Sequence, residues 1–539
     1  MSDYDQTFDF DYGNGDAWPV DFVTTPHADS SSFRMSDHGY TMGGPEKVAQ
    51  QHAKGRMTAR ERIAALCDEG THFREFGQLN HSDLPATQGK TPADGKICGF
   101  GPVEGRTVYA MADDITVLAG SGGRVGVGKT NKTQHYAEEK GYPIVNMGEG
   151  GGTRMPDNLG AANHMRTPSR MAGGTRDRRV PFVNCIMGEC YGSPTWKTAL
   201  ADVSVQVKGT CMAVSGPRVI AQSTGEKLTP EQLGGWELHA RETGLIDLFA
   251  DDDAHCLRLV RQVLSYLPSS YTQLPPVVKT EDDPDRRLDD ILSIMPQSLR
   301  RAYDMHKMLD RIFDKGSVLE LKPFFDPSLI IAFARLNGQT VGVFASNPQH
   351  NAGAQGPGAC EKATAFVCLC DSFHIPMVML HDTPGFFIGS AAEKRKMPLK
   401  IMTLSLALQN RSVPLLSVIM RKSYGLAHRT MGGAGAQADV LLAWPGADIS
   451  FMAADSSVGT VYARELAKAA NPDELRAQYL EKIQAMNAPW EAAGLNLIDD
   501  VIDPLDTRKE LIAHLKLVCG SDGEGARSQR RMANWPGMF

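Results

Sequence analysis

The sequence contains one long segment twice, and this duplication constrains the fold more than any other feature. The segment VPFVNCIMGECYG at residues 180–192 returns as VPLLSVIMRKSYG at residues 413–425, an offset of 233. Other pairs at this offset are Gly105 and Gly338, Lys129 and Lys362, and Gly152 and Gly385. Solenoid repeats are several-fold shorter. We therefore predict two copies of one domain, joined head to tail.

The chain has 539 residues, 42% of them hydrophobic, and is long enough for two large cores. In each copy, strand-like apolar runs alternate with helical segments, which indicates βαβ units with right-handed crossovers. We predict an α/β fold of two homologous domains, at residues 41–280 and 281–539. Residues 1–40 are rich in Asp, Ser and Gly and have no apolar periodicity, so we expect a flexible acidic tail there.

Composition and charge exclude several classes of protein. No apolar run reaches the ~18–20 residues of a membrane span, and the first residues are acidic, so we expect a cytoplasmic protein without a membrane partner. The net charge of −7 argues against nucleic acid as a partner. The ten cysteines show no zinc-ligand spacing, so we expect buried thiols and no metal.

One motif suggests a nucleotide hydrolase. Residues 123–130, GRVGVGKT, fit the phosphate-loop pattern GxxxxGK[ST] and lead into a helix predicted over residues 129–140. However, no such loop surrounds Lys362, the twin of Lys129, and the next strand offers Glu149 but no Asp for magnesium. We therefore expect that a repeated scaffold holds the lysine, at a helix end where it could contact a phosphate of another ligand.

A set of short motifs resembles the carboxyltransferase (β) subunits of biotin-dependent acyl-CoA carboxylases, the propionyl-CoA carboxylase family. These motifs include GGTR at 151–154, TGE at 224–226, DTPGF at 382–386, RKSYG at 421–425 and AWPG at 443–446. They follow the family's order from about residue 45 to 515. The resemblance implies two crotonase-like (ClpP/crotonase superfold) domains in tandem, with acyl-CoA on the side of the first domain and biotin on that of the second.

The chemistry implied by the resemblance needs few side chains. Transfer of a carboxyl group from carboxybiotin to the α-carbon of an acyl-CoA develops negative charge on the thioester oxygen and on the biotin ureido oxygen. Backbone N–H donors at helix N-termini stabilise such oxygens, typically by ~3–4 kcal/mol per donor. Biotin itself can take the α-proton, in keeping with the lack of any Ser/His/Asp or paired-carboxylate motif.

The resemblance also indicates site residues. The catalytic amides of the first domain fall at Gly192 and Ser193, and a count without gaps from residues 384–386 places those of the second domain at Ile401 and Met402. The residues expected to bind acyl-CoA are Ser121, Lys129, Gly151, Gly152 and Arg154. Those expected to bind biotin are Gly353, Gly385, Phe386 and Tyr424.

Some residues differ from the family's pattern. Pro194 removes the donor that would follow Ser193, and bulky side chains stand at Ile401 and Met402. The isolated His381 and His428 are expected to be structural.

The resemblance implies a homo-oligomer, a hexamer, with an acyl-CoA thioester as substrate. Its partners would be a biotin carboxylase subunit and a separate carrier protein that bears the biotin. Two other hypotheses stay open. One is the α-type subunit of a biotin-dependent acyl-CoA decarboxylase, which runs the transfer in reverse. The other is a catalytically altered paralogue that binds acyl-CoA or a partner without turnover.

Overall fold

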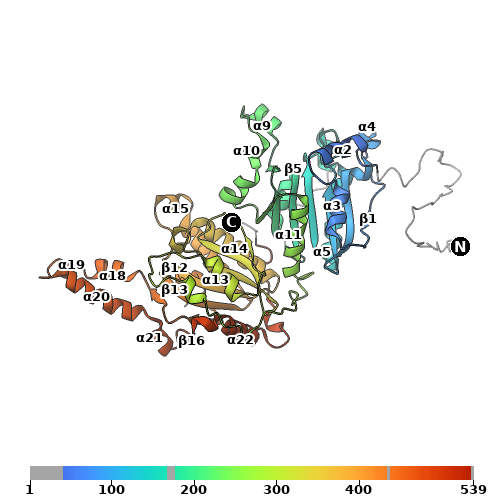
Figure 1. Ribbon diagram of the computed structural model, residues 1–539. Helices are drawn as coiled ribbons and strands as arrows, with labels where there is room; N and C mark the ends of the chain where they lie inside the picture. Colours follow the sequence, from blue (N-terminus) through green and yellow to red (C-terminus); the bar gives the residue numbers. More distant parts are fainter. Residues whose placement is uncertain (1–40, 167–176, 434–437, 536–539) are drawn as a thin grey trace, which may run out of the picture.

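Two eight-stranded sheets, one from each half of the chain, form the body of the molecule (Figure 1). The structure is a computed structural model that describes residues 41–166, 177–433 and 438–535. The tail predicted at residues 1–40 lies outside these described residues. The predicted boundary at residue 280 stays a prediction, and it lies between the last strand of one sheet and the first strand of the other.

The first sheet has the order β1-β2-β3-β4-β5-β6-β8, with β7 paired to β5. Strands β1 to β3 pair antiparallel, and all later pairs are parallel. The strands are β1 (Arg74–Phe76), β2 (Lys96–Val103), β3 (Arg106–Asp113), β4 (Ile144–Gly150), β5 (Phe182–Tyr191), β6 (Val203–Val207), β7 (Cys211–Ala213) and β8 (Leu248–Ala250).

The second sheet has the same plan, in the order β9-β10-β11-β12-β13-β14-β16, with β15 paired to β13. Here β9 to β11 pair antiparallel and the rest are parallel. The strands are β9 (Leu319–Leu321), β10 (Leu329–Leu336), β11 (Gln339–Ser346), β12 (Met377–Thr383), β13 (Leu415–Tyr424), β14 (Val440–Ala443), β15 (Asp448–Ser450) and β16 (Asp500–Val501).

Helices connect and cover the strands. Those of the first half are α2 (Pro45–Ala53), α3 (Ala59–Leu66), α4 (Pro85–Gln88), α5 (Arg124–Lys140), α6 (Met155–Asn158), α7 (Ala161–Arg166), α8 (Ser193–Leu200), α9 (Pro217–Ser223), α10 (Pro230–Gly234) and α11 (Asp253–Tyr266). Those of the second half are α12 (Ile291–Ile294), α13 (Met305–Ile312), α14 (Pro357–Ser372), α15 (Ser390–Lys394), α16 (Met397–Asn410), α17 (Ala427–Thr430), α18 (Ala454–Val461), α19 (Ala463–Leu466), α20 (Pro472–Asn487), α21 (Pro489–Gly494) and α22 (Thr507–Cys519). Two of the longer helices have clear capping residues. The Asp252 side chain caps the start of α11, and Gly141, in the left-handed conformation, ends α5.

The offset read from the sequence recurs in the structure. Strands β10, β11, β12 and β13 begin and end at that offset from β2, β3, β4 and β5. The pairing register repeats too, because Asn146 faces Asn184 in the first sheet and Met379 faces Ser417 in the second. Farther along, β14 and β15 follow β6 and β7 at a slightly larger offset. The predicted α/β fold of two homologous domains is therefore confirmed.

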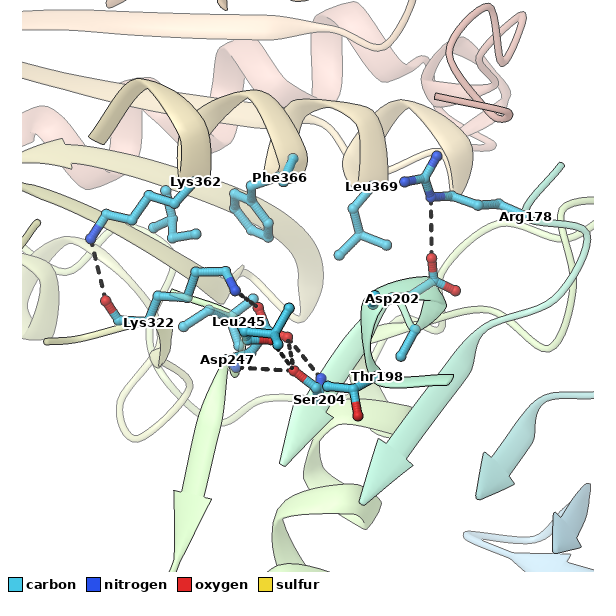
Figure 2. A pocket seen from close by; sticks show the side chains of 15 residues that line it. Arg178, Thr198, Asp202, Ser204, Leu245, Asp247, Lys322, Lys362, Phe366 and Leu369 are labelled. Carbon is cyan, nitrogen blue, oxygen red and sulfur yellow. Dashed lines mark hydrogen bonds and ion pairs between the residues drawn. The ribbon is translucent and has the colours of Figure 1, made fainter. Parts of the chain in front are cut away.

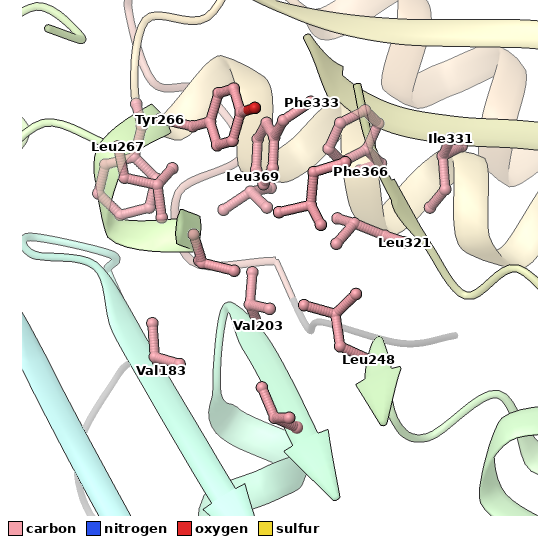
Figure 3. Packing of buried hydrophobic residues seen from close by; sticks show 14 of the residues in the cluster. Val183, Val203, Leu248, Tyr266, Leu267, Leu321, Ile331, Phe333, Phe366 and Leu369 are labelled. Atoms are coloured by element: carbon pink, nitrogen blue, oxygen red, sulfur yellow. The ribbon is translucent and has the colours of Figure 1, made fainter. Parts of the chain in front are cut away.

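The two halves share one apolar core. Its largest cluster combines residues of the first half, such as Val203 and Leu248, with residues of the second, such as Ile331 and Leu369 (Figure 3). At the edge of this cluster the ring of Tyr266 stacks on Phe333, with 5.5 Å between the ring centroids. A second cluster lies wholly within the second half. The two domains are thus packed face to face within one chain.

Candidate active site

Chain turns meet at the carboxyl end of the first sheet. The backbone N–H of Gly122 donates to the carbonyl of Gly152 at 2.7 Å, and that of Arg154 donates back to the carbonyl of Gly122 at 2.9 Å. Gly152 has φ +83, and a Cβ there would lie 2.6 Å from the carbonyl oxygen of Tyr191. Only glycine fits this position, so the turn brings backbone unusually close to the end of β5.

The next turn, after β5, presents a backbone amide. Gly192 has φ +71, and its N–H donates to the carbonyl of Ala213 at 3.2 Å. Ser193 is the first residue of α8, so its N–H has no acceptor within the helix. Pro194 has no N–H, and that of Thr195 donates to the carbonyl of Gly192 at 2.9 Å. The Ser193 amide is therefore the donor that this turn offers to a ligand.

A cleft opens over these turns. Its lining includes Gly122, Val127, Thr130, Gln134, Ile144, Gly152, Ser193, Pro194 and Lys197. The structure thus brings together two of the predicted site residues, Gly152 and Ser193, at one cleft.

The second sheet repeats the first of these turns. The N–H of Gln355 donates to the carbonyl of Gly385 at 3.0 Å, and that of Phe387 donates to the carbonyl of Gln355 at 2.9 Å. These are the same hydrogen bonds as in the first half, between residues at the duplicated positions. Gly353 packs against this turn, since Thr383 Oγ1 donates to its carbonyl at 2.8 Å. Three residues predicted for biotin, namely Gly353, Gly385 and Phe386, therefore gather at one turn.

The amides predicted at Ile401 and Met402 are wrong. Both residues lie inside α16, as its fifth and sixth residues, where a backbone N–H is already bonded to a carbonyl one turn earlier. The Ile401 side chain packs against the large core, whereas the Met402 side chain is 51% exposed. The count without gaps led into a helix and missed the turn.

The structural counterparts of Gly192 and Ser193 are Gly425 and Leu426. Strand β13 ends at Tyr424, Gly425 has φ +60, and the N–H of Gly425 donates to the carbonyl of Ser450 at 3.0 Å. This is the arrangement seen at Gly192 after β5. The signal was present in the sequence, because Gly192 and Gly425 are the last residues of the two copies of the duplicated segment.

A buried carboxylate precedes the glycine turn in each half, at the duplicated position. In the first half, Glu149 accepts from Arg62 at 2.5 Å. In the second half, Asp382 accepts from Arg421 at 2.8 Å. The partners come from different elements, Arg62 from α3 and Arg421 from β13, and each carboxylate stands three residues before a turn glycine, Gly152 or Gly385.

The structure contradicts the predicted phosphate contact of Lys129. The helix begins at Arg124 instead of Lys129, so the GxxxxGK[ST] segment forms the first turns of α5 and not a phosphate-binding loop. The Lys129 ammonium is buried and donates to the carbonyls of Lys96 at 2.6 Å and Gly77 at 2.9 Å. Burial also lowers the pKa of this ammonium. Lys129 is therefore a structural lysine.

The twin of Lys129 is structural as well. Lys362 lies in a small cavity between the two halves, where its ammonium donates to the carbonyl of Lys322 at 3.3 Å (Figure 2). Burial lowers the pKa of Lys362 to about 8. Next to it, Lys322 pairs with Asp247 at 3.0 Å. Both copies of the duplicated lysine thus stabilise the scaffold.

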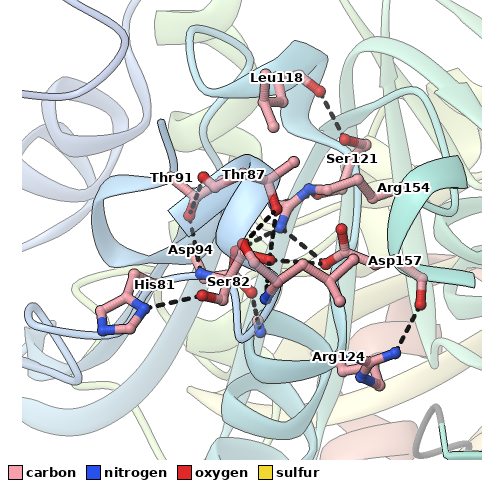
Figure 4. A network of polar contacts seen from close by, with 12 residues as sticks. His81, Ser82, Thr87, Thr91, Asp94, Leu118, Ser121, Arg124, Arg154 and Asp157 are labelled. Carbon is pink, nitrogen blue, oxygen red and sulfur yellow. Dashed lines mark hydrogen bonds and ion pairs between the residues drawn. The ribbon is translucent and has the colours of Figure 1, made fainter. Parts of the chain in front are cut away.

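Arg154 and Ser121, both predicted to bind acyl-CoA, hold the turn itself (Figure 4). The guanidinium of Arg154 is 2% exposed and donates to Asp94 at 2.6 Å, to Asp157 at 3.3 Å and to the carbonyl of Ser121 at 3.2 Å. The Ser121 hydroxyl donates to the carbonyl of Leu118 at 2.6 Å. The two terminal nitrogens of Arg154 and the hydroxyl of Ser121 are therefore bonded within the protein, and neither contact with acyl-CoA is supported.

Two histidines form a buried polar chain beside the second site. Ser417 donates to the carbonyl of Met431 at 2.9 Å, so it must accept from His381 Nε2 at 2.6 Å. In the neutral ring the other nitrogen, Nδ1, accepts from Ser423 at 3.0 Å, and Ser423 accepts from His428 Nδ1 at 2.8 Å. This order requires His381 to be neutral, and it suits a neutral His428. Burial lowers the pKa of His381 to about 3 and that of His428 to about 4, in agreement.

Other expected features concern cysteines, metals and membranes. All ten cysteines are unbridged and all but Cys67 are buried, which confirms the predicted thiols. Within residues 41–166, 177–433 and 438–535, no cluster of three or more His, Cys, Asp or Glu is arranged to hold a metal ion. Over the same ranges, no helix has both the length and the hydropathy needed to cross a membrane.

Comparisons with known proteins identify close similarities. A model of the carboxyl transferase domain matches residues 50–531. The propionyl-CoA carboxylase carboxyltransferase subunit of Haloferax mediterranei is 38% identical over 485 residues, which cover 88% of this chain and 93% of that protein. The methylmalonyl-CoA decarboxylase subunit alpha of Propionigenium modestum is 32% identical, covering 89% and 93%. The crystal structure of transcarboxylase 12S, a hexamer with methylmalonyl-CoA bound, superposes with a TM-score of 0.84 at 33% identity, covering 89% and 93%.

Proposed function

This chain belongs to the carboxyl transferase domain family, and from that premise we propose that it is the carboxyltransferase component of a biotin-dependent acyl-CoA carboxylase. It transfers a carboxyl group from carboxybiotin to the α-carbon of an acyl-CoA. The observation that carries the proposal is the doubled turn: two crotonase-like domains each present a glycine and a backbone amide at the end of the same strand, at Gly192–Ser193 and at Gly425–Leu426.

At the first turn, the thioester oxygen accepts a hydrogen bond from the Ser193 N–H. Negative charge grows on this oxygen as the α-carbon becomes nucleophilic, and the N-terminal end of α8 stabilises it. The donor is in place before the substrate arrives, because Ser193 begins α8 and the N–H of Gly192 before it is bonded to the carbonyl of Ala213 at 3.2 Å. Rate acceleration then comes from orientation and electrostatics.

At the second turn, we assign the Leu426 N–H to the ureido oxygen of biotin. When bound, carboxybiotin supplies the carboxyl group, and its ureido oxygen becomes anionic as that group leaves. Such a group can approach the backbone closely at Gly385, which has no side chain and where an added Cβ would meet only the carbonyl oxygen of Tyr424, at 4.0 Å. Ile401 and Met402 take no part in this donor set.

We also propose that the active site forms between subunits of a homo-oligomer, a hexamer as in the 12S structure. Leu399, Met402 and Leu406 form an apolar stripe on α16, exposed by 57%, 51% and 46%. Trp196 and Leu200 expose apolar surface on α8, directly after the first turn, by 49% and 38%. A second copy that covers both stripes would bring the first turn of one subunit to the second turn of another. Helix α9 and helices α18–α20 project from the body of the molecule, while α10 packs on β7, and they offer further surface for such contacts (Figure 1).

The remaining components are proposed from the family. Biotin arrives on a separate carrier protein, a biotin carboxylase subunit recharges it, and the complex works in the cytoplasm. The proposal that this chain is one subunit of a complex is supported by relatives that are themselves named as subunits.

A second candidate is decarboxylation, in which the chain acts as the α-type subunit of a biotin-dependent decarboxylase. It is favoured by the relative from Propionigenium modestum, which covers the chain as fully as the carboxylase subunit does. Both candidates use the same two turns and differ in the direction of transfer.

The deciding experiment incubates the protein with the biotinylated carrier of an acyl-CoA carboxylase and a panel of acyl-CoAs. Carboxylation of an acyl-CoA supports the proposal, carboxyl transfer from malonyl-type CoA to biotin alone supports the decarboxylase, and binding without turnover supports the altered paralogue. Replacing Ser193→Pro removes the proposed donor at a position where proline suits the start of a helix. We expect kcat to fall about 10²–10³-fold, whereas Ser193→Ala keeps the N–H and the activity.

A further inference from the structure

The cleft over the first turn contains a lysine that the proposed mechanism does not use. Lys197 lies one helical turn after Ser193 on α8, so both residues face the same side and both line the cleft. Its ammonium donates to Asn146 Oδ1 at 2.8 Å. Asn146 stands in the middle of β4, well before the strand ends at Gly150. The ammonium therefore lies deeper than the turn, where the far end of an acyl group would be.

Lys197 differs from the other cations that line this cleft. Each of the others has a carboxylate partner: Lys96 pairs with Asp113 at 2.7 Å, Arg178 with Asp202 at 3.2 Å, and Arg179 with Asp177 at 2.7 Å. In the part of the cleft that the structure describes, Lys197 instead bonds to a neutral amide. A largely buried ammonium without a bonded counter-ion is costly, and an anionic ligand would remove the cost.

The duplication shows that the scaffold does not require these charges. Lys96 and Asp113 line the cleft together with the lysine, and its partner Asn146 donates through Nδ2 to Asn184 Oδ1 at 2.7 Å. Their counterparts in the second half, at the duplicated positions, are Leu329, Ser346, Met379 and Ser417. By the same count Lys197 corresponds to Thr430. The second domain folds with uncharged residues at these places, so the polar cleft floor belongs to the first site alone.

We propose that Lys197 binds a carboxylate at the distal end of the acyl group, and that the preferred substrates are CoA thioesters of dicarboxylic acids. This inference rests on the proposed function, because it assumes that the cleft holds the acyl group. The amide at Ser193 fixes the thioester end and the ammonium fixes the other end. Burial lowers the pKa of Lys197, and a bound carboxylate would favour the charged form again.

The test compares thioesters of equal chain length, with and without the terminal carboxylate: succinyl-CoA against butyryl-CoA, glutaryl-CoA against valeryl-CoA, and adipyl-CoA against hexanoyl-CoA. We expect at least one dicarboxylic member to have a kcat/KM about tenfold or more above that of its partner, as a charge-assisted hydrogen bond provides. Lys197→Met should abolish this preference and leave the aliphatic substrate within about threefold. Lys132→Met, which removes an exposed lysine of α5, is the matched control.

A wild-type enzyme that prefers all three aliphatic thioesters would overturn the inference, and so would a preference that survives Lys197→Met. If the variant does not fold, the wild-type ratios decide. If no acyl-CoA of either kind is carboxylated, the proposed function fails. Calorimetric binding of glutaryl-CoA and valeryl-CoA to the wild-type protein then tests Lys197 separately: equal dissociation constants contradict the assignment, and tighter binding of glutaryl-CoA supports it.

Discussion

At the scale of single residues, the two proposed sites depend on backbone N–H groups. Side chains matter mainly because they fix the positions of these groups. Gly192 and Gly425 have positive φ angles that let the chain turn sharply after β5 and β13. The residue that follows each glycine offers its N–H. Side chains predicted to bind ligands, such as those of Arg154 and Lys129, are instead bonded to the protein.

Replacing Leu426→Pro should remove the amide proposed for biotin and leave the fold intact, because Leu426 already has φ −69, the angle proline prefers. Loss of one preformed donor predicts a fall in kcat of about 10²–10³-fold. The variant Leu426→Ala keeps the donor and should stay near wild type. Steady-state kinetics with carboxylated carrier would show this, and equal activity of the proline and alanine variants would rule out the assignment.

How far the sequence predicts a residue's role depends on what competes for its polar groups. The turn at Gly152 was predictable, because a run of glycines after a strand has few other uses. Lys129 was not, since a lysine near a helix start can bind a phosphate or nearby carbonyls, and only the fold brings the carbonyls of Gly77 and Lys96 to it. For Gly425 the duplication was sufficient, but the gapless count from residues 384–386 led elsewhere.

At the scale of elements, the strand ends of the second sheet are tied together by the polar chain through His381 and Ser423. This chain of hydrogen bonds joins β12, β13 and α17. It therefore connects the residues on both sides of the turn at Gly425. Strands such as β4 and β5 were predictable because apolar runs bounded by turn residues occur in both copies. In its described residues, the first half has no such chain of hydroxyls and imidazoles, since Asn184 stands at the position of Ser417. The duplication therefore could not predict these hydrogen bonds.

The chain should make stability sensitive to acid. The folded-state pKa of His381 is lowered to about 3, below the value of about 6.5 in an unfolded chain, so the unfolded state binds the proton first as the pH falls. The contribution of the neutral His381 to the free energy of unfolding is therefore fully present above about pH 6.5, and it is lost as the pH falls from about 6.5 to 3. His381→Gln should flatten this part of the curve. Thermal unfolding followed from about pH 7.5 to 4.5 would reveal it, and parallel curves for variant and wild type would contradict it.

At the scale of the whole molecule, the proposed site is divided between the two halves of the chain. The first turn and the second turn belong to different sheets, and each has an exposed apolar stripe beside it, on α8 and on α16. The duplication predicted the two domains, but nothing in one sequence reports which surfaces a second copy covers. Such a surface is recognised by the solvent exposure of its apolar side chains, which is known only for the folded chain.

Replacing Met402→Glu should disrupt the oligomer and leave each subunit folded, because this side chain is 51% exposed in the single chain and would become buried in the assembly. A charge at the centre of an apolar contact is strongly unfavourable. Light scattering should report smaller particles, and carboxyl transfer should fall with them. Leu517→Glu, at a position 75% exposed on α22, serves as the control. An intact, active oligomer of the Met402→Glu variant would refute the proposed interface.

The core that both halves share has a consequence for how the carboxyl group travels. Since Val203, Leu248, Ile331 and Leu369 pack in one cluster, a rotation of one domain relative to the other would expose this buried apolar surface to water. The two domains therefore keep a fixed position relative to each other. If the proposed function holds, the movement between sites must then come from the proposed biotin carrier and not from a hinge between the two domains.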